Sequence, residues 1–109
     1  MNDLNVETKQ AFYLSGKLLR EWVEVDGKEH GPHKWYYENG KLRGEYNWVD
    51  GKKHGPVKRY HENGNTELVR NYVDGKQHGP YKSYHENGSL RMARNYVDGE
   101  REGEQIFYK

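Results

Sequence analysis

The chain has 109 residues, a length that suits one domain with a small buried core. Its 18 lysines and arginines nearly balance its 17 aspartates and glutamates, so no basic surface indicates a nucleic acid partner. The absence of cysteine excludes both a disulfide framework and a thiolate metal site.

Large aliphatic side chains are scarce, whereas tyrosine and tryptophan are frequent. Val, Leu, Ile and Phe together make up 18 residues, a level that by itself indicates disorder. Ten tyrosines, three tryptophans and a net charge of only +1 oppose that interpretation, because these rings bury area while their polar tips stay wet. We therefore expect aromatic side chains to take the place of an aliphatic core.

The first ten residues, MNDLNVETKQ, lack the basic start and the apolar stretch of a signal peptide. No apolar run in the sequence approaches the length that spans a bilayer. We expect residues 1–10 to be a poorly ordered tail and the protein to be cytoplasmic, although an export route without a cleaved signal would leave the same sequence.

From residue 11 onward the sequence repeats with a period of 24 residues and without a gap. Asp-Gly, His-Gly-Pro and Glu-Asn-Gly each return at this spacing. The repeat domain, residues 11–109, divides into a half unit 11–24, full units 25–48, 49–72 and 73–96, and a half unit 97–109.

Asp-Gly and Asn-Gly pairs are strong short-range signals for antiparallel hairpins. They predict turns at Asn39, Gly40, Asp50, Gly51, Asn63, Gly64, Asp74, Gly75, Asn87, Gly88, Asp98 and Gly99. Gly-Pro between them marks where a strand begins. The pattern predicts an all-β fold, a single-layered antiparallel β-meander about 40 Å long. Its expected strands are 10–14, 17–24, 33–37, 41–48, 57–61, 65–72, 81–85, 89–96 and 104–108.

The large rings occupy mostly even positions and the valines odd positions, which predicts one aromatic face and one valine-bearing face. Three-residue turns such as Glu38-Asn39-Gly40 keep this parity and place Tyr36 opposite Leu42. Two-residue turns would place Tyr36 opposite Arg43, so we expect the three-residue form.

The repeated residues resemble the MORN-repeat variant family over nearly all of the chain. In the second unit the matching positions are Asp50, Gly51, Lys52, Gly55, Tyr60, Glu62, Asn63 and Gly64. The resemblance implies a single-layered β-meander that serves as an interaction platform. A YwqK-type bacterial subset of the family is labelled antitoxin, which implies a toxin as the protein partner. Other relatives imply membrane phospholipid binding or cytoskeletal scaffolding. The chain departs from the family pattern at Glu24, Val57, Thr66 and Gln105.

Repeated histidines and aspartates raise the question of a metal site or a catalytic site. His30, His54 and His78 lie two strands apart, about 9.6 Å, whereas ligands of one ion lie within about 2.1 Å of it. His30 with His33, or His61 beside His85, remains an alternative for adventitious binding. Each Asp of an Asp-Gly pair is expected to bond its own turn backbone. Catalysis needs an acid and a base that differ in role and pKa around a concave site, and the sequence shows no such pair. We therefore expect no enzyme, no metal and no cofactor.

Three columns of the repeat carry the candidate binding residues. One column is nearly constant and is expected to be structural: Phe12, Tyr36, Tyr60, Tyr84 and Tyr108. A second column on the same face varies among residue types that anchor interfaces: Trp22, Tyr46, Arg70 and Arg94. A third column, with Trp35 and Arg59, is expected on the opposite face. Tolerated surface drift is the alternative explanation for both variable columns.

The last strand, near residues 105–108, is expected to be an open edge guarded by glutamates. A strand of another protein could pair with such an edge, and so could a second copy of this chain; the sequence leaves both open. The sequence therefore predicts a non-catalytic module that binds another protein, with antitoxin-like neutralisation of a toxin as its role. A membrane-associated or cytoskeletal scaffold is the alternative.

Overall fold

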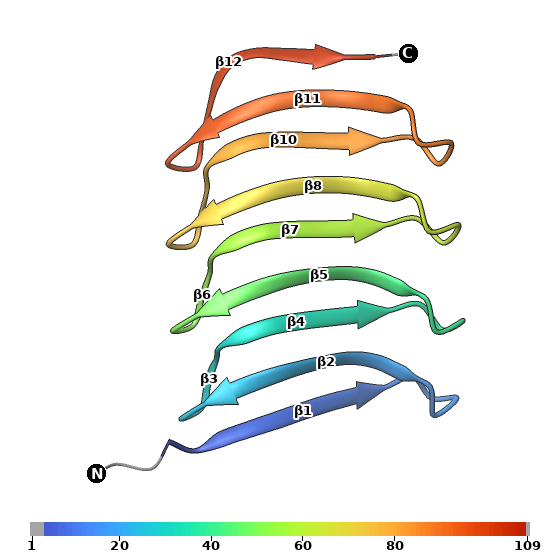
Figure 1. Cartoon of the computed structure of the whole chain (residues 1–109), viewed down its shortest axis with the longest axis vertical. Coiled ribbons are helices and arrows are strands. Elements are labelled where there is room, and N and C mark those ends of the chain that lie inside the picture. Colours follow the sequence, from blue (N-terminus) through green and yellow to red (C-terminus); the bar gives the residue numbers. More distant parts are fainter. Residues whose placement is uncertain (1–3, 109) are drawn as a thin grey trace.

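The computed structural model describes residues 4–108, which form one open antiparallel sheet (Figure 1). Its strands are β1 (Val6–Phe12), β2 (Leu18–Val25), β3 (Lys28–Glu29), β4 (Gly31–Tyr36), β5 (Leu42–Val49), β6 (Lys52–Lys53), β7 (Gly55–Tyr60), β8 (Thr66–Val73), β9 (Lys76–Gln77), β10 (Gly79–Tyr84), β11 (Leu90–Val97) and β12 (Glu100–Phe107). The order β1-β2-β4-β5-β7-β8-β10-β11-β12 follows the chain, and β3, β6 and β9 pair with β2, β5 and β8. The predicted all-β meander is confirmed.

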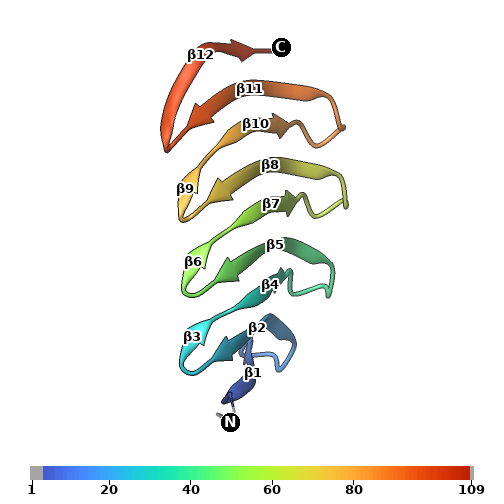
Figure 2. The same cartoon turned by 60° about the vertical axis from the view of Figure 1, so that its left-hand side comes forward.

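The sheet is one layer thick and longer than expected. Its principal extents are 52 × 36 × 17 Å. The expected nine strands are present, and the short strands β3, β6 and β9 are additional. Each of these precedes a glycine with positive φ at residue 31, 55 or 79. Figure 2 shows the chain bending there, so His-Gly-Pro marks both a bend and the start of the next strand.

The first strand begins earlier than the sequence suggested. β1 starts at Val6, which pairs with Val25, and the pairing continues to Phe12 opposite Leu18. Residues 6–10, expected to belong to a tail, are therefore held by the ladder of β2, and residues 1–3 lie outside the described part of the chain.

The Asp-Gly turns are tight two-residue hairpins. Asp50 has φ 50° and Gly51 has φ 81°, so both central residues are left-handed, as in a type I′ turn. The amide of Gly51 donates to the carbonyl of Glu29 in the preceding repeat, 3.1 Å away. We expected each Asp to bond its own turn, but Asp26 accepts from the amide of Asn5 instead. Within residues 4–108, side chains bond the backbone of their own turn at the Ser15-Gly16 turn and at the Asn-Gly turns.

The Asn-Gly turns have the predicted three-residue form. Tyr36 pairs with Leu42, the amide of Gly40 donates to Tyr37, and Gly40 has φ 89°. The Asn39 side chain accepts the amide of Lys41 at 2.9 Å, and Asn63 and Asn87 make the equivalent bond.

A bulge directly after each of these turns reverses the relation between position and face. Tyr36 pairs with Leu42, but the next pair is Trp35 with Gly44, so Arg43 has no partner across the ladder. Even positions of β5 consequently share a face with odd positions of β4. The expectation that the even-numbered rings share one face is therefore wrong, because the sequence pattern did not reveal the extra residue.

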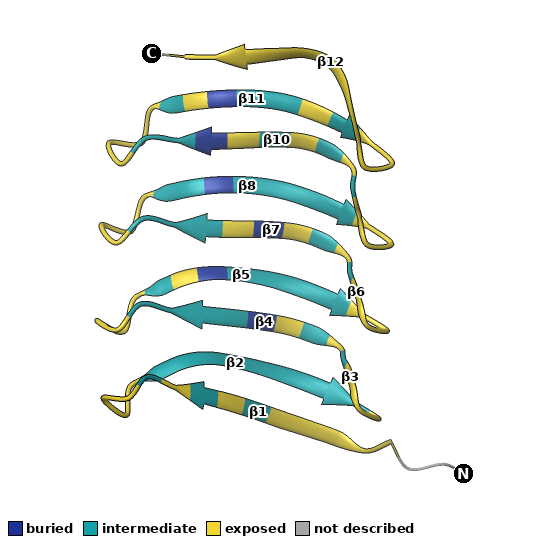
Figure 3. Ribbon diagram, turned by 180° about the vertical axis from the view of Figure 1, so that it is seen from behind, coloured by how far each residue is buried: buried dark blue, intermediate teal, exposed yellow. Residues whose placement is uncertain are grey.

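We call the face that bears Trp35 and Gly44 the packed face. Figure 3 shows the buried positions as a band across β4 to β11. These residues, all on the packed face by their register, are His33, Gly44, Val57, Leu68, Ser83 and Met92. Tyr36, the neighbour of Trp35 in its strand, points to the other face.

Tyrosine and histidine side chains at the Asn-Gly ends join successive repeats. The Tyr13 hydroxyl donates to the Tyr36 carbonyl at 2.8 Å, and the Tyr37 hydroxyl donates to the Tyr60 carbonyl at 2.6 Å. His61 Nε2 bonds the Tyr84 carbonyl at 2.9 Å in the same way. Neighbouring hairpins are thus held by side chains as well as by the ladder.

Replacing Tyr37 with Phe removes one of these bonds without changing the ring. We expect Tyr37→Phe to lower the free energy of unfolding by about 1 kcal/mol, the net contribution of a neutral hydrogen bond. Urea unfolding followed by circular dichroism measures the change.

Tyr60→Phe is the matched control, since its hydroxyl makes no hydrogen bond within residues 4–108. Equal losses in the two variants would contradict the role of the Tyr37 bond.

Candidate functional site

A stack of aromatic rings lies on the packed face around His33. The His33 ring lies 5.4 Å from Trp22, 5.3 Å from Trp35 and 4.9 Å from Tyr46, nearly parallel to each. Trp48 meets Tyr46 edge to face at 6.0 Å. These contacts join β2, β4 and β5, and they explain how a sheet without a second layer buries its rings.

The surroundings of His33 at the centre of this stack favour its neutral form. It is 3% exposed, and its Nδ1 lies 2.6 Å from a carboxylate oxygen of Glu29. Burial is the main influence and lowers the pKa of His33. Glu29 opposes this effect, while the cations Arg20 and Lys53 add to it.

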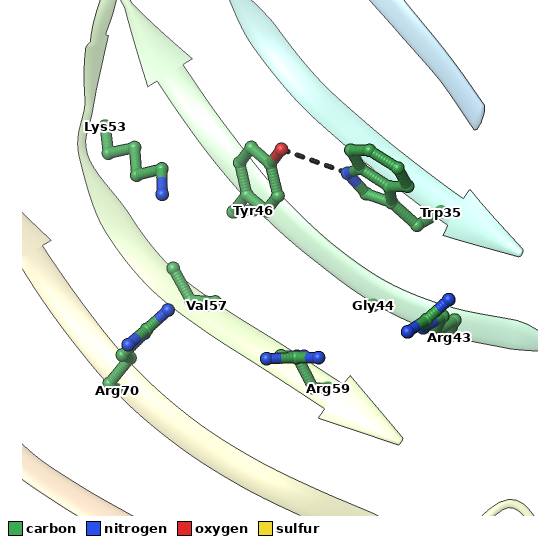
Figure 4. A pocket seen from close by; sticks show the side chains of 8 residues that line it. All are labelled: Trp35, Arg43, Gly44, Tyr46, Lys53, Val57, Arg59 and Arg70. Atoms are coloured by element: carbon green, nitrogen blue, oxygen red, sulfur yellow. Dashed lines mark hydrogen bonds between the residues drawn. The ribbon is translucent and has the colours of Figure 1, made fainter. Parts of the chain in front are cut away.

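Beside the stack lies a groove of about 270 Å³, which we call the β5–β8 groove. Its lining residues are Trp35, Arg43, Gly44, Tyr46, Lys53, Val57, Arg59 and Arg70. Figure 4 shows Val57 between the basic side chains, with Trp35 and Tyr46 along one side. The Trp35 indole donates to the Tyr46 hydroxyl at 3.0 Å, which fixes this side.

A glycine opens the groove. Gly44 occupies the column that holds Leu68 and Met92 in the later repeats. A Cβ at Gly44 would lie 3.2 Å from the Lys58 carbonyl and 3.3 Å from Arg59 Cγ, so a side chain there would require these neighbours to shift by a few tenths of an ångström.

Three of the four cations of the groove, Arg43, Lys53 and Arg70, have aromatic neighbours in place of carboxylates. Lys53 Nζ lies 5.0 Å from the centre of the Tyr46 ring and 5.3 Å from that of Tyr72. Arg70 also lies over Tyr72, at 5.6 Å, and Arg43 lies over Tyr37 at 5.4 Å. Burial, with the charge of Arg70, lowers the pKa of Lys53.

Within residues 4–108, none of these four cations lies within 4 Å of a carboxylate oxygen. Arg70 Nε is buried and has no hydrogen-bond partner there. The groove therefore combines positive charge, a free donor and rigid rings.

The structure brings four of the six predicted partner-binding residues together. Trp35, Tyr46, Arg59 and Arg70 line the same groove. The expectation that the column of Trp35 and Arg59 lies on the opposite face is wrong, because the bulge turns Tyr46 to their side.

The other two predicted residues lie outside the groove. Trp22 stacks on His33, and its indole donates to Glu24. Arg94, on β11, lies over Tyr81 and donates to the Tyr96 hydroxyl.

The expected structural column does not form the core. Tyr36, Tyr60 and Tyr84 are half-buried, whereas Phe12 is 55% exposed and Tyr108 is 45% exposed. The physical reason is again the bulge, which leaves this column on the face opposite the buried band.

Sequence reasoning missed Arg43, Gly44, Lys53 and Val57. A glycine inside a predicted strand signals close backbone approach, and that signal marked Gly44. The others gave no signal, because Arg and Lys in a strand are typical of a solvated surface. Across residues 4–108, no three potential metal ligands converge and no helix could span a membrane.

His33 makes the stability of the fold depend on pH. The ordinary pKa of histidine is near 6.5, and the folded value is lower, so the unfolded chain binds this proton first. We expect the free energy of unfolding to fall as the pH drops below 6.5 toward the folded pKa, and this group to have no effect well above 6.5.

Urea unfolding of the natural chain and of His33→Val at about pH 7.5 and about pH 5.5 measures how the free energy of unfolding changes with pH. This pH window lies above the range where ordinary carboxylates titrate. Val57 occupies the same column, so valine fits the fold. An equal slope in both proteins would contradict the role of His33.

Comparison with known families agrees with the repeat geometry. A family model described as MORN repeat variant matches residues 29–50, 53–74 and 77–98, which together cover more than half of the chain. A search of curated proteins gave no match. Each matched segment contains one complete hairpin, β4-β5, β7-β8 or β10-β11, with the Asn-Gly turn that joins its two strands. The chain belongs to the MORN repeat variant family.

Proposed function

We propose that the chain is a non-catalytic module that binds a partner protein on its packed face, around the β5–β8 groove. MORN repeats are generally protein- or lipid-binding modules and are typically not enzymes. The observation that carries the proposal is the convergence of Trp35, Tyr46, Arg59 and Arg70 at one groove. Tryptophan, tyrosine and arginine are the residues that contribute most to protein interfaces.

The shape of the sheet supports binding to a broad surface. Its 52 × 36 Å face exceeds the roughly 800 Å² that each partner of a stable complex buries. The proposed role is antitoxin-like or immunity-like neutralisation, in which the sheet covers the active surface of a toxin. The stacked rings would supply rigid contact area, and the arginines would supply specificity.

The composition of the groove supports a role without catalysis. Its lining holds no carboxylate, histidine or hydroxyl nucleophile beyond the Tyr46 phenol. Burial raises the pKa of Tyr46, which keeps that phenol protonated. A paired acid and base with different pKa values, as general acid–base chemistry requires, does not line this groove.

The experiment is a pull-down from the source lysate with the natural chain and with Trp35→Ala/Arg59→Ala. We expect one protein to be retained by the natural chain and lost by the variant, and the purified partner to bind about tenfold more weakly to the variant. Circular dichroism and thermal melting establish that both chains are folded.

Lys34→Ala/Lys58→Ala is the matched control, because these lysines lie on the opposite face at neighbouring ladder positions. Equal retention by all three chains, or no retained protein, would refute the proposal.

A further inference from the structure

The β5–β8 groove concentrates positive charge in a chain that is otherwise balanced. The whole chain has 18 basic and 17 acidic residues, yet Arg43, Lys53, Arg59 and Arg70 line this groove and no carboxylate does. The nearby Glu29 is bonded to His33. Like charges gathered in a partly desolvated site repel one another unless an anion joins them.

The repeat does not require this charge. The equivalent region one repeat later has Glu67 in place of Arg43, Gln77 in place of Lys53 and Ser83 in place of Arg59. Leu68 and Tyr81 also replace the small Gly44 and Val57 there. Only the Arg70 position keeps its charge there, as Arg94. The fold is thus built without the other three cations, so folding alone does not account for Arg43, Lys53 and Arg59.

The groove also has unused donors in fixed positions. Arg70 Nε is buried without a partner within residues 4–108. The Tyr46 hydroxyl accepts the Trp35 indole proton, which leaves its own proton free to donate toward the groove. Aromatic rings already hold Arg43, Lys53 and Arg70, which lowers the entropic cost of fixing them around an anion.

Charge on both sides of the groove favours a short ligand over a membrane surface. The two neighbouring hollows carry mixed charge. The hollow toward β2 is lined by Glu24 and Glu29 with Arg20 and Lys28, and the hollow toward β10 by Glu67 and Glu86 with Arg91. An anionic bilayer would meet these carboxylates as well as the cations, whereas membrane attraction needs a broad basic surface. A peptide, by contrast, needs to place only its acidic side chains in this one groove.

We infer that the β5–β8 groove binds an acidic segment of the partner protein, with aspartate or glutamate carboxylates against Arg59, Arg70 and Lys53. This inference rests on the proposed function, whose partner it describes chemically. Arginine is suited to this role because its planar head donates two parallel hydrogen bonds to one carboxylate.

The test is an NMR titration of the full chain with acetyl-hexaglutamate amide. We expect the Arg70 Nε–H and Trp35 Nε1–H signals to shift, and the shifts to weaken as potassium chloride is raised. Arg59→Gln/Arg70→Gln should weaken binding about tenfold or more, because it removes the two bidentate donors. Lys34→Gln/Lys58→Gln, with the same loss of charge on the other face, should bind as the natural chain does.

Two further variants keep the test decisive if the double glutamine variant does not fold. Arg59→Ser introduces the residue that Ser83 already places in this column, and it should also weaken binding. Arg59→Glu/Arg70→Glu should lose hexaglutamate and gain acetyl-hexalysine amide. No binding of hexaglutamate, or equal binding by the control and groove variants, would overturn the inference.

Vesicles of phosphatidylserine and phosphatidylcholine form the competing arm. Vesicle binding that is lost with Arg59→Gln/Arg70→Gln, in the absence of hexaglutamate binding, would overturn the inference in favour of a lipid surface. If hexaglutamate fails to bind but capture of the partner protein still depends on Trp35 and Arg59, only the acidic segment is refuted. If hexaglutamate does not bind and capture of a partner does not depend on Trp35 and Arg59, the proposed function is refuted as well.

Discussion

The bulge that follows each Asn-Gly turn determines which side chains meet. One unpaired residue, Arg43 in the first full repeat, shifts the ladder so that Trp35 pairs with Gly44. The next strand begins with the same odd-to-even relation, since Gly44 pairs with Arg59. The packed face is therefore continuous across hairpins, and both variable columns of the repeat lie on it.

A sheet without a second layer must bury this face with its own side chains. The described residues bury few hydrophobic side chains, namely Val57, Leu68 and Met92. Parallel rings around His33 and cations over aromatic faces supply the remaining contact. Because the same rings are only partly covered, the surface that stabilises the sheet is also the surface that a partner can contact. Stability and binding thus draw on the same residues, as in other repeat proteins whose units contact only their neighbours.

The sequence predicted the features that depend on local chemistry. Asp-Gly and Asn-Gly specify their turns through left-handed backbone, and the 24-residue period specifies the meander. The bulge was not predictable, because Leu19, Arg43, Glu67 and Arg91 share no property that marks the extra position. For that reason the predicted assignment of residues to the two faces was wrong, and so was the expectation that the column of Tyr36 forms the core. The bonds of Tyr37 and His61 to the next repeat depend on distances between hairpins, which a periodic pattern does not contain.

The sequence predicted four of the eight residues that line the candidate site, but not how they come together. Variation in an otherwise constant repeat identified Trp35, Tyr46, Arg59 and Arg70, whereas their convergence depends on the register and on the space above Gly44. The groove is therefore a product of tertiary pairing and not of any short motif.

The most direct test of the account is a nuclear Overhauser spectrum of the chain in solution. With the bulged register, His33 ring protons give cross-peaks to the Tyr46 ring, whose centre lies 4.9 Å away, and the Trp35 indole proton gives cross-peaks to Tyr46. Without the bulge, Tyr46 would lie opposite Pro32 and not opposite His33. Cross-peaks from the Tyr46 ring to Pro32, without those from His33, would therefore show an unbulged ladder and would contradict the shared face on which the groove depends.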